Sequence, residues 1–522
     1  MSIIHKIGIY EKLKTRLDYK IICIAFPLII INTYSLFLNQ TYSCDHIPGY
    51  FSNEFSLLEA IKGSFLGGRP VTIISILLNR FLALFGIGYF HYQWVMNIFT
   101  MMLMSLDCVL LYDLFDEYVD GKLKLVFSIC ILMALVNGCF VELFPLYGAE
   151  HAITILLGVI ALYLFKGEKY KLSFLTSFLM VGSYQSYYSL FIVYGMLMVY
   201  LQTNGQLSLA SVKKYVQVCF IAALSVLSVM ALTRISSIII GSNEVKQVTL
   251  ASGSTAIWER LAYMYVSLHD LMIDGYGFMP YYLILIMYIL LNLFALWGLY
   301  QSHQYGRFIV HCVCMIIMII SPFAFGIVVS YPTFVPRTVI PFFMALGVIF
   351  YISIEDVYSY LRFLEIKENV FLESIAMVLL IFMCFTVHGI QTGASDVLTS
   401  NKVEMQVCRE VERAIEKYEK DTGNEIKTVK AVHFGYRYVF DETYCNLTYS
   451  RMYASGHLLL VAEWADVNLL NMVTGQNYAK EYASWDECYQ MYDDFDPSQS
   501  LRSFKADEQL AFDGDTLYWL LY

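Results

Sequence analysis

The sequence has 522 residues, of which 58% are hydrophobic and only 15% are charged, with a formal net charge of −10. Because soluble domains carry about 25% charged residues, this composition indicates an integral membrane protein. The negative charge argues against a nucleic-acid-binding function. It is concentrated from Gln391 onward, where 22 acidic and 12 basic residues are found.

The N-terminal segment is basic and is followed by an apolar run at 21–39. The basic residues are Lys6, Lys12, Lys14, Arg16 and Lys20. This pattern is typical of a signal peptide, but the run is long and has no clear small-residue cleavage site. We therefore expect a retained first span with a cytoplasmic N-terminus.

Apolar segments of about the length that crosses a bilayer recur as far as residue 390. The further segments that we expect to cross lie at about 93–115, 125–142, 151–165, 172–183, 187–202, 215–232, 277–300, 308–329, 338–354 and 370–390. With the first span, they predict an all-α membrane domain over 1–390 with about eleven transmembrane helices. An acidic, extracytoplasmic α/β domain is expected over 391–522.

Segment 70–90 is also apolar, but we expect it to lie along the outer interface without crossing. It begins at Pro70 and has Asn79 and Arg80 in its middle, and a charge at the bilayer centre is costly. With this arrangement the N-terminus and the inner loops hold 15 of the 22 Lys and Arg residues before Gln391, as the positive-inside rule requires. A true span with a snorkelling arginine is the alternative.

Two further segments have distinctive patterns. Segment 172–183 is short for a crossing, and the polar, aromatic stretch 182–188 follows it. This pattern predicts a broken or short helix pair that lines a cavity near the outer surface. In the C-terminal domain we expect a helix at about 401–420 and strands near 428–435, 457–462 and 516–521.

Cysteine and histidine spacing predicts no metal site. Four cysteines, Cys44, Cys408, Cys445 and Cys488, fall in segments expected outside, where disulfide pairing is chemically allowed. Walker, zincin and dinucleotide-binding motifs are not found in the sequence. We therefore expect neither a metal nor another cofactor.

Polar side chains gather in the segments that this topology places outside. A carboxylate next to a membrane-edge cavity can act as a general base on a hydroxyl, and an arginine there can bind a phosphate. Taken singly, Asp45 is more often a solvated loop acid and Arg69 or Arg337 an interfacial anchor. Glu150 alone is more often a helix-capping acid. Their combination in one compartment is more informative than any one of them.

The order of these features resembles the GT-C superfamily of membrane glycosyltransferases, and more narrowly the bacterial O-antigen-type glucosyltransferase (Gtr) family. The pieces that carry the resemblance are Asp45, Gly68-Arg69-Pro70, Glu142, Tyr147 to His151, Tyr184-Gln185, Pro336-Arg337 and the closing stretch Phe512 to Tyr518. Two positions depart from the family's pattern. His46 follows Asp45 where a second acid is often found, and Glu150 stands where an aspartate is expected.

The resemblance implies transfer of a sugar, glucose in the family's pattern, from a polyprenyl-phosphate donor to a cell-surface glycan, with inversion. It also implies a bacterial inner-membrane location. The implied catalytic residues are Asp45, Glu54 and Glu150, and the implied donor-phosphate ligands are Arg69 and Arg337. The implied acceptor or sugar ligands are His46, Tyr147, His151, Tyr184 and Gln185.

Two other classes of function compete with this interpretation. The chain is alternatively a carrier or flippase for a lipid-linked glycan, which should have paired repeats and charges at the membrane midplane. No obvious internal repeat is present in the sequence. The third hypothesis is a non-catalytic subunit of an envelope complex, with the C-terminal domain as its binding module.

Overall fold

The computed structural model describes most of the chain in several stretches. These are residues 57–85, 89–135, 148–241, 258–262, 264–266, 281–328, 336–365, 368–433, 460, 465–492 and 504–521. The expected first span and the first outer loop up to residue 56 lie outside them.

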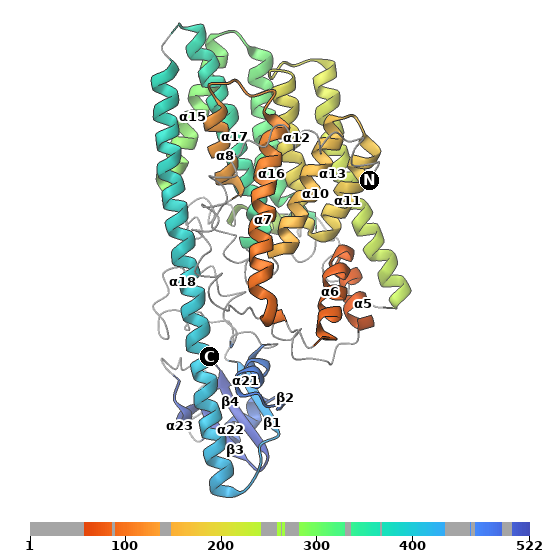
Figure 1. Cartoon of the computed structure of the whole chain (residues 1–522), viewed down its shortest axis with the longest axis vertical. Coiled ribbons are helices and arrows are strands. Elements are labelled where there is room, and N and C mark those ends of the chain that lie inside the picture. The colour runs from red at the N-terminus through yellow and green to blue at the C-terminus, as the bar shows by residue number, and fades with distance from the viewer. Residues whose placement is uncertain are drawn as a thin grey trace.

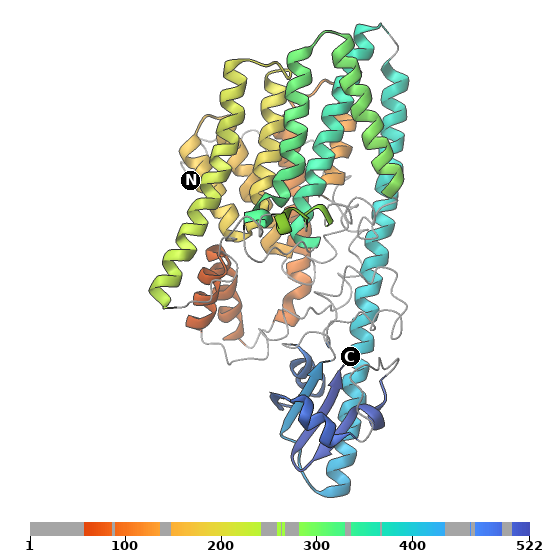
Figure 2. The same cartoon turned by 180° about the vertical axis from the view of Figure 1, so that it is seen from behind.

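A bundle of helices makes up most of the described structure, and a small α/β domain lies beyond one end of it (Figures 1 and 2). We call the end near this domain the proximal end and the opposite end the distal end. The bundle contains α7 (Tyr89–Phe115), α8 (Lys124–Leu135), α10 (Gly148–Lys166), α11 (Tyr170–Ser183), α12 (Tyr188–Gln202), α13 (Leu209–Ile240), α15 (Tyr281–Gln301), α16 (Tyr305–Val328), α17 (Pro336–Phe363) and the first part of α18 (Glu368–Thr422). Each span expected from residue 93 onward corresponds to one of these helices.

Six helices in the described ranges are long and apolar enough to cross a bilayer. They fall within α7, α10, α13, α16, α17 and α18, and α15 adds the shorter apolar segment Ile286–Gln301. The expected total of eleven stays a prediction, because the first span lies outside the described residues and α8, α11 and α12 are short.

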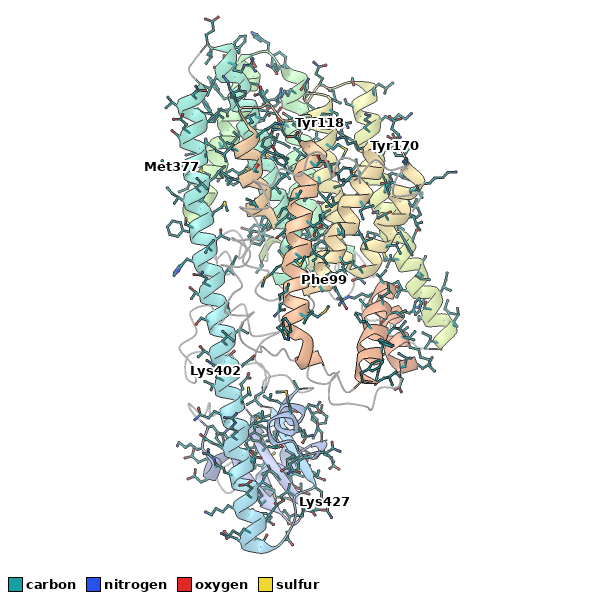
Figure 3. The ribbon with its side chains drawn as sticks, in the orientation of Figure 1. Phe99, Tyr118, Tyr170, Met377, Lys402 and Lys427 are labelled. Atoms are coloured by element: carbon teal, nitrogen blue, oxygen red, sulfur yellow. The ribbon has the colours of Figure 1, made fainter. Side chains whose placement is uncertain are left out.

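Helix α12 lies at the centre of the bundle. Every residue from Tyr188 to Leu201 is buried, which explains why this segment is apolar on all sides rather than on one face. Glycine allows close packing here, since a Cβ atom on Gly195 would meet Val218 of α13 at 2.7 Å. In Figure 3, Phe99 lies within α7, and Tyr118, just beyond the C-terminal end of α7, lies nearer the distal end.

The described part of segment 70–90 that precedes α7 forms only short helical elements, and its position along the interface stays a prediction. Helix α5 (Leu57–Leu66), the 3₁₀ turn η1 (Pro70–Thr72) and α6 (Ile73–Ala83) make a hairpin at the proximal end, beside α13 (Figure 1). With 11 residues, α6 is about 16 Å long, about half of the hydrocarbon core. Its apolar side chains Ile74, Leu77 and Phe81 are exposed, as expected of an interfacial helix.

A single helix, α18, joins the bundle to the C-terminal domain. It has 55 residues, or about 80 Å of continuous helix. The domain boundary expected between residues 390 and 391 therefore falls inside α18. The helix expected at 401–420 is the part of α18 that packs against the C-terminal domain. The domain is thus joined to the bundle by a continuous helix.

The domain contains a four-stranded sheet in the order β2-β1-β4-β3. Strands β1 (Thr428–His433), β2 (Ala479–Tyr482) and β4 (Thr516–Leu521) are parallel, and β3 (Leu510–Asp513) pairs antiparallel with β4. Helices α21 (Asp466–Thr474), α22 (Trp485–Met491) and α23 (Ala506–Gln509) complete the described part. The sequence predicted β1 and β4 but missed the short strands β2 and β3.

Two other predictions concern this domain. The strand expected at 457–462 lies almost wholly outside the described residues, and Leu460, the one residue described there, is in a turn. Cys408 and Cys488 are free, buried thiols in separate apolar clusters, so they do not pair with each other. Cys44 and Cys445 lie outside the described residues.

Candidate functional site

The candidate site is built around Arg69, at the turn between α5 and η1. The chain leaves α5 through Gly68, whose φ of +67° lies in the left-handed region that favours glycine. The N–H of Arg69 then donates to the carbonyl of Ser64 at 2.8 Å. This arrangement ends α5 and brings Arg69 to the side of the hairpin that faces α11.

The bend between α11 and α12 provides the surface against which Arg69 packs. Its guanidinium carbon lies 4.5 Å from the ring centroid of Tyr184, which is within cation–π range. The His151 ring lies on the same tyrosine at 4.4 Å, and His151 Nδ1 lies 3.1 Å from the hydroxyl of Tyr187. Three elements distant in sequence therefore meet in one aromatic cluster.

Glu150 brings a carboxylate to this cluster from the first turn of α10. The hydroxyl of Ser75, on α6, donates a hydrogen bond to its Oε1. Arg69 is near enough to attract the same carboxylate electrostatically. A carboxylate and a guanidinium cation thus lie together at the proximal end of the bundle, near the expected membrane boundary.

Several donors in the cluster have no hydrogen-bond partner among the described residues. They are Arg69 Nε, the Tyr184 hydroxyl and the Ser186 hydroxyl, all shielded from solvent. Buried polar groups in native proteins are nearly always paired with protein, water or ligand. An unpaired donor on the guanidinium and another on the tyrosine against which it packs are suited to an anion that carries several acceptor oxygens.

The structure brings together five of the ten residues that the sequence nominated: Arg69, Glu150, His151, Tyr184 and Gln185. Asp45, His46, Glu54 and Tyr147 lie outside the described residues. Arg337 lies in the first turn of α17, but its side chain is also outside the description. Whether these residues complete the site stays a prediction.

Two nominated residues make contacts that support the cluster. Only 1% of His151 is exposed, and its ring is enclosed by tyrosines. Gln185 donates through Nε2 to the carbonyls of Gly67 and Gly68, at 2.8 and 2.9 Å. One polar atom of each side chain, His151 Nδ1 and Gln185 Nε2, is engaged by the protein itself, and the role of both residues as sugar ligands stays a prediction.

Ser75 and Tyr187 are members of the cluster that sequence reasoning did not single out. Tyr187 lies within the polar, aromatic stretch at 182–188, so the pattern that identified Tyr184 also pointed to it. Ser75 had no signal of its own, because it is a small polar residue in an apolar helix.

A second polar cluster, which the sequence did not indicate, lies within the bundle at the distal end. Asp356 of α17 accepts hydrogen bonds from Arg307 Nε at 2.6 Å and from the Tyr200 hydroxyl at 2.6 and 2.7 Å. His311 Nδ1 lies 2.6 Å from the same carboxylate, and Glu355 lies 3.3 Å from Arg307.

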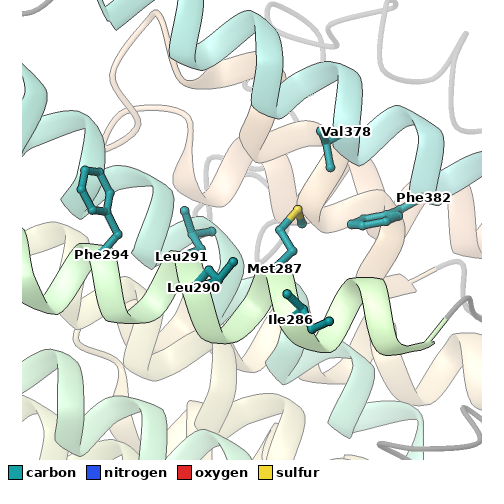
Figure 4. A pocket seen from close by; sticks show the side chains of 7 residues that line it. All are labelled: Ile286, Met287, Leu290, Leu291, Phe294, Val378 and Phe382. Carbon is teal, nitrogen blue, oxygen red and sulfur yellow. The ribbon is translucent and has the colours of Figure 1, made fainter.

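A groove of about 550 Å³ lies between α15 and α18 (Figure 4). Its walls include Ile286, Met287 and Leu290 of α15 and Val378 and Phe382 of α18. These side chains offer hydrocarbon alone, so the groove is not a candidate for phosphate or sugar chemistry. In the described residues, no group of three or more His, Cys, Asp or Glu side chains is arranged to hold a metal ion.

No protein-family model matches the chain, and no curated protein is significantly similar to it in sequence. The functional interpretation therefore depends on the chemistry of the residues and on the resemblance of short motifs.

Proposed function

We propose that the protein is a membrane glycosyltransferase that moves a sugar from a polyprenyl-phosphate donor to a cell-surface glycan. The observation that carries the proposal is the arrangement of Arg69. Its guanidinium is held against Tyr184, beside the Glu150 carboxylate, with an unpaired Nε–H. A lipid phosphate at the membrane boundary supplies negative charge for the guanidinium and acceptor oxygens for the Nε–H.

The position of the cluster supports a donor that is anchored in lipid. The α5–α6 hairpin exposes apolar side chains next to Arg69, so a polyprenyl chain can stay in hydrocarbon while its phosphate reaches the guanidinium. We further propose that the proximal end is extracytoplasmic and that the membrane is the bacterial inner membrane. The acidic C-terminal domain then lies on the side where a surface glycan is available.

The proposed reaction is a single displacement. The acceptor hydroxyl oxygen attacks the anomeric carbon, the bond from that carbon to the phosphate oxygen breaks, and polyprenyl phosphate leaves with the electron pair. A carboxylate accepts the hydroxyl proton, and we assign this role to Asp45, with Glu54 and Glu150 as the other acids of the site. Arg69, together with Arg337, stabilises the charge that develops on the leaving phosphate.

The test is transfer of labelled glucose from undecaprenyl phosphate glucose to lipopolysaccharide in vesicles that contain the purified protein. Asp45→Asn should lower turnover by about 10²–10⁴, the usual contribution of a general base. Arg69→Ala should lower it by about 10²–10³. Arg80→Ala is the matched control, because Arg80 is the second arginine of the same hairpin and lies outside the cluster.

Undiminished transfer by Arg69→Ala would reject the proposed phosphate site. Undiminished transfer by Asp45→Asn would remove Asp45 as the base and would direct the same test to Glu54 and Glu150. A wild-type protein that moves the intact labelled lipid across the vesicle membrane, without transferring its sugar, would favour the carrier hypothesis instead.

A further inference from the structure

The turn that carries Arg69 has two carbonyl groups in need of donors. The carbonyls of Gly67 and Gly68 follow the end of α5, where helices leave backbone acceptors unsatisfied. Pro70 comes directly afterwards and has no N–H group to offer. A donor from elsewhere in the fold is therefore required to hold this turn.

Gln185 provides that donor from a position more than 110 residues further along the chain. Its Nε2 lies 2.8 Å from the Gly67 oxygen and 2.9 Å from the Gly68 oxygen. A primary amide nitrogen has two hydrogens, so one side chain can satisfy both carbonyls. The amide occupies the space beside the turn, since a Cβ atom on Gly68 would come within 2.7 Å of it.

Two adjacent residues of the bend between α11 and α12 thus contact adjacent residues of the turn between α5 and η1. The Tyr184 ring supports the Arg69 guanidinium, while Gln185 fixes the backbone immediately before Arg69. Thr233 of α13 lies on another side, with its hydroxyl 3.2 Å from the position of a Gly68 Cβ. The bend and α13 therefore both lie close to Gly68, the residue immediately before Arg69.

We infer that Gln185 is a positioning residue that acts through Arg69 and makes no contact with the sugar. This inference rests on the proposed function for its consequence in binding, although the holding contact itself is independent of any ligand. Loss of the amide should free the turn and lower the share of molecules whose Arg69 is ready to bind phosphate. The effect should vanish when Arg69 is absent.

The first measurement is hydrogen–deuterium exchange of the full-length protein in detergent. In Gln185→Leu, which removes both hydrogen bonds at similar volume, the amides of residues 67–69 should exchange at least about tenfold faster. Gln202→Leu is the matched control. Gln202 is also a glutamine with two side-chain hydrogen bonds, to Tyr118 and Lys214, but it lies at the distal end of α12. Unchanged exchange at 67–69 in Gln185→Leu would overturn the inference.

The second measurement is binding of dodecyl phosphate, with dodecanol as the uncharged control. Gln185→Leu should weaken phosphate binding by about tenfold, the typical value of two neutral hydrogen bonds, and Gln202→Leu should not. The double variant Arg69→Ala/Gln185→Leu should bind no more weakly than Arg69→Ala alone, because a residue that acts only through Arg69 adds nothing once Arg69 is gone. Fully additive losses would contradict the positioning role.

The two measurements separate this inference from the proposed function. Faster exchange in Gln185→Leu, together with Arg69-dependent phosphate binding but no sugar transfer, would support the positioning role and reject the transferase. A wild-type protein that does not bind dodecyl phosphate would reject the phosphate site itself. The exchange result would then decide whether Gln185 holds the turn.

Discussion

Arg69 and Arg307 each pack against a tyrosine, but their surroundings differ. Arg69 lies 4.5 Å from the Tyr184 ring and Arg307 lies 5.4 Å from the Tyr200 ring. Arg307 donates at short distances to Asp356 and also contacts Glu355. Arg69 keeps an Nε–H with no partner among the described residues. One cation is satisfied by the protein, and the other still has a donor to offer.

This difference separates an arginine that holds the fold from one that can hold a ligand. Buried charges are costly unless they are paired and hydrogen-bonded, and Arg307 and Asp356 meet both conditions through each other and through Tyr200. Arg69 lies at the proximal end, beside one carboxylate that is also bonded to Ser75. Similar cation–π contacts therefore serve different ends, and the hydrogen-bond partners distinguish them.

The sharpest test of the comparison is removal of Arg307. Arg307→Ala should destabilise the protein by about 3–5 kcal/mol, because it leaves the Asp356 carboxylate buried without its cation. Thermal unfolding in detergent, or the yield of monodisperse protein, measures the effect. A loss below about 1 kcal/mol would show that this cluster does not hold the helices together.

Removal of Arg69 should have the opposite profile. Arg69→Ala loses a cation–π contact worth about 0.5–2 kcal/mol, and Glu150 keeps its hydrogen bond from Ser75. Unfolding should therefore change less than in Arg307→Ala, while sugar transfer falls by about 10²–10³. Measuring unfolding and transfer on the same preparation tests the distinction directly. A strongly destabilised Arg69→Ala protein would place both arginines in the structural class.

A substitution next to Arg69 sharpens the comparison further. Gly68→Ala should destabilise the hairpin by about 1–2 kcal/mol, since alanine pays the left-handed penalty and its Cβ would meet Gln185 at 2.7 Å. Gly63→Ala, one turn earlier in α5, is the control because nothing lies within 4 Å of its Cβ position. It should leave stability unchanged or raise it slightly. Equal effects at the two glycines would contradict the close approach of Gln185.

The smallest effect is expected from an ion pair of the C-terminal domain. Lys430 Nζ lies 2.7 Å from Glu487 Oε1. This hydrogen bond, with a further contribution from Ser484, lowers the pKa of Glu487 from 4.5 to about 2. A lowered pKa contributes stability above pH 4.5, and this contribution is lost as the pH falls toward 2. Because both groups are partly exposed, it should stay below about 1 kcal/mol.

Acid titration of the unfolding temperature of the domain measures this contribution. Glu487→Gln should flatten the change of the unfolding temperature between pH 4.5 and 2. Glu481→Gln is the control, because Glu481 also faces Lys430 but at the longer distance of 3.8 Å. An unchanged profile in Glu487→Gln would contradict the lowered pKa. Arg307 is thus buried and paired, and Glu487 is partly exposed and paired. Arg69 differs from both, because its Nε–H has no partner among the described residues.

The sequence by itself determined which segments form the helices of the bundle. Apolar runs between 93 and 390 each correspond to a helix, because a run of this length has few ways to satisfy its backbone groups in lipid other than as a helix. It also indicated that 70–90 does not cross, since Pro70, Asn79 and Arg80 oppose a span. It nominated Arg69, Glu150 and Tyr184 through their combination in the segments expected outside and through the resemblance of short motifs, since each residue taken singly more often has a structural role.

Only the tertiary structure decided which of these residues meet, and what each one does. The contact between Gln185 and Gly67 joins positions 118 residues apart, and that of Arg307 with Asp356 joins α16 to α17. Local patterns determine helices because their hydrogen bonds are local, whereas these contacts depend on how helices pack. The same side chains, an arginine over a tyrosine, become a structural cluster or a candidate site according to the partners that packing brings to them.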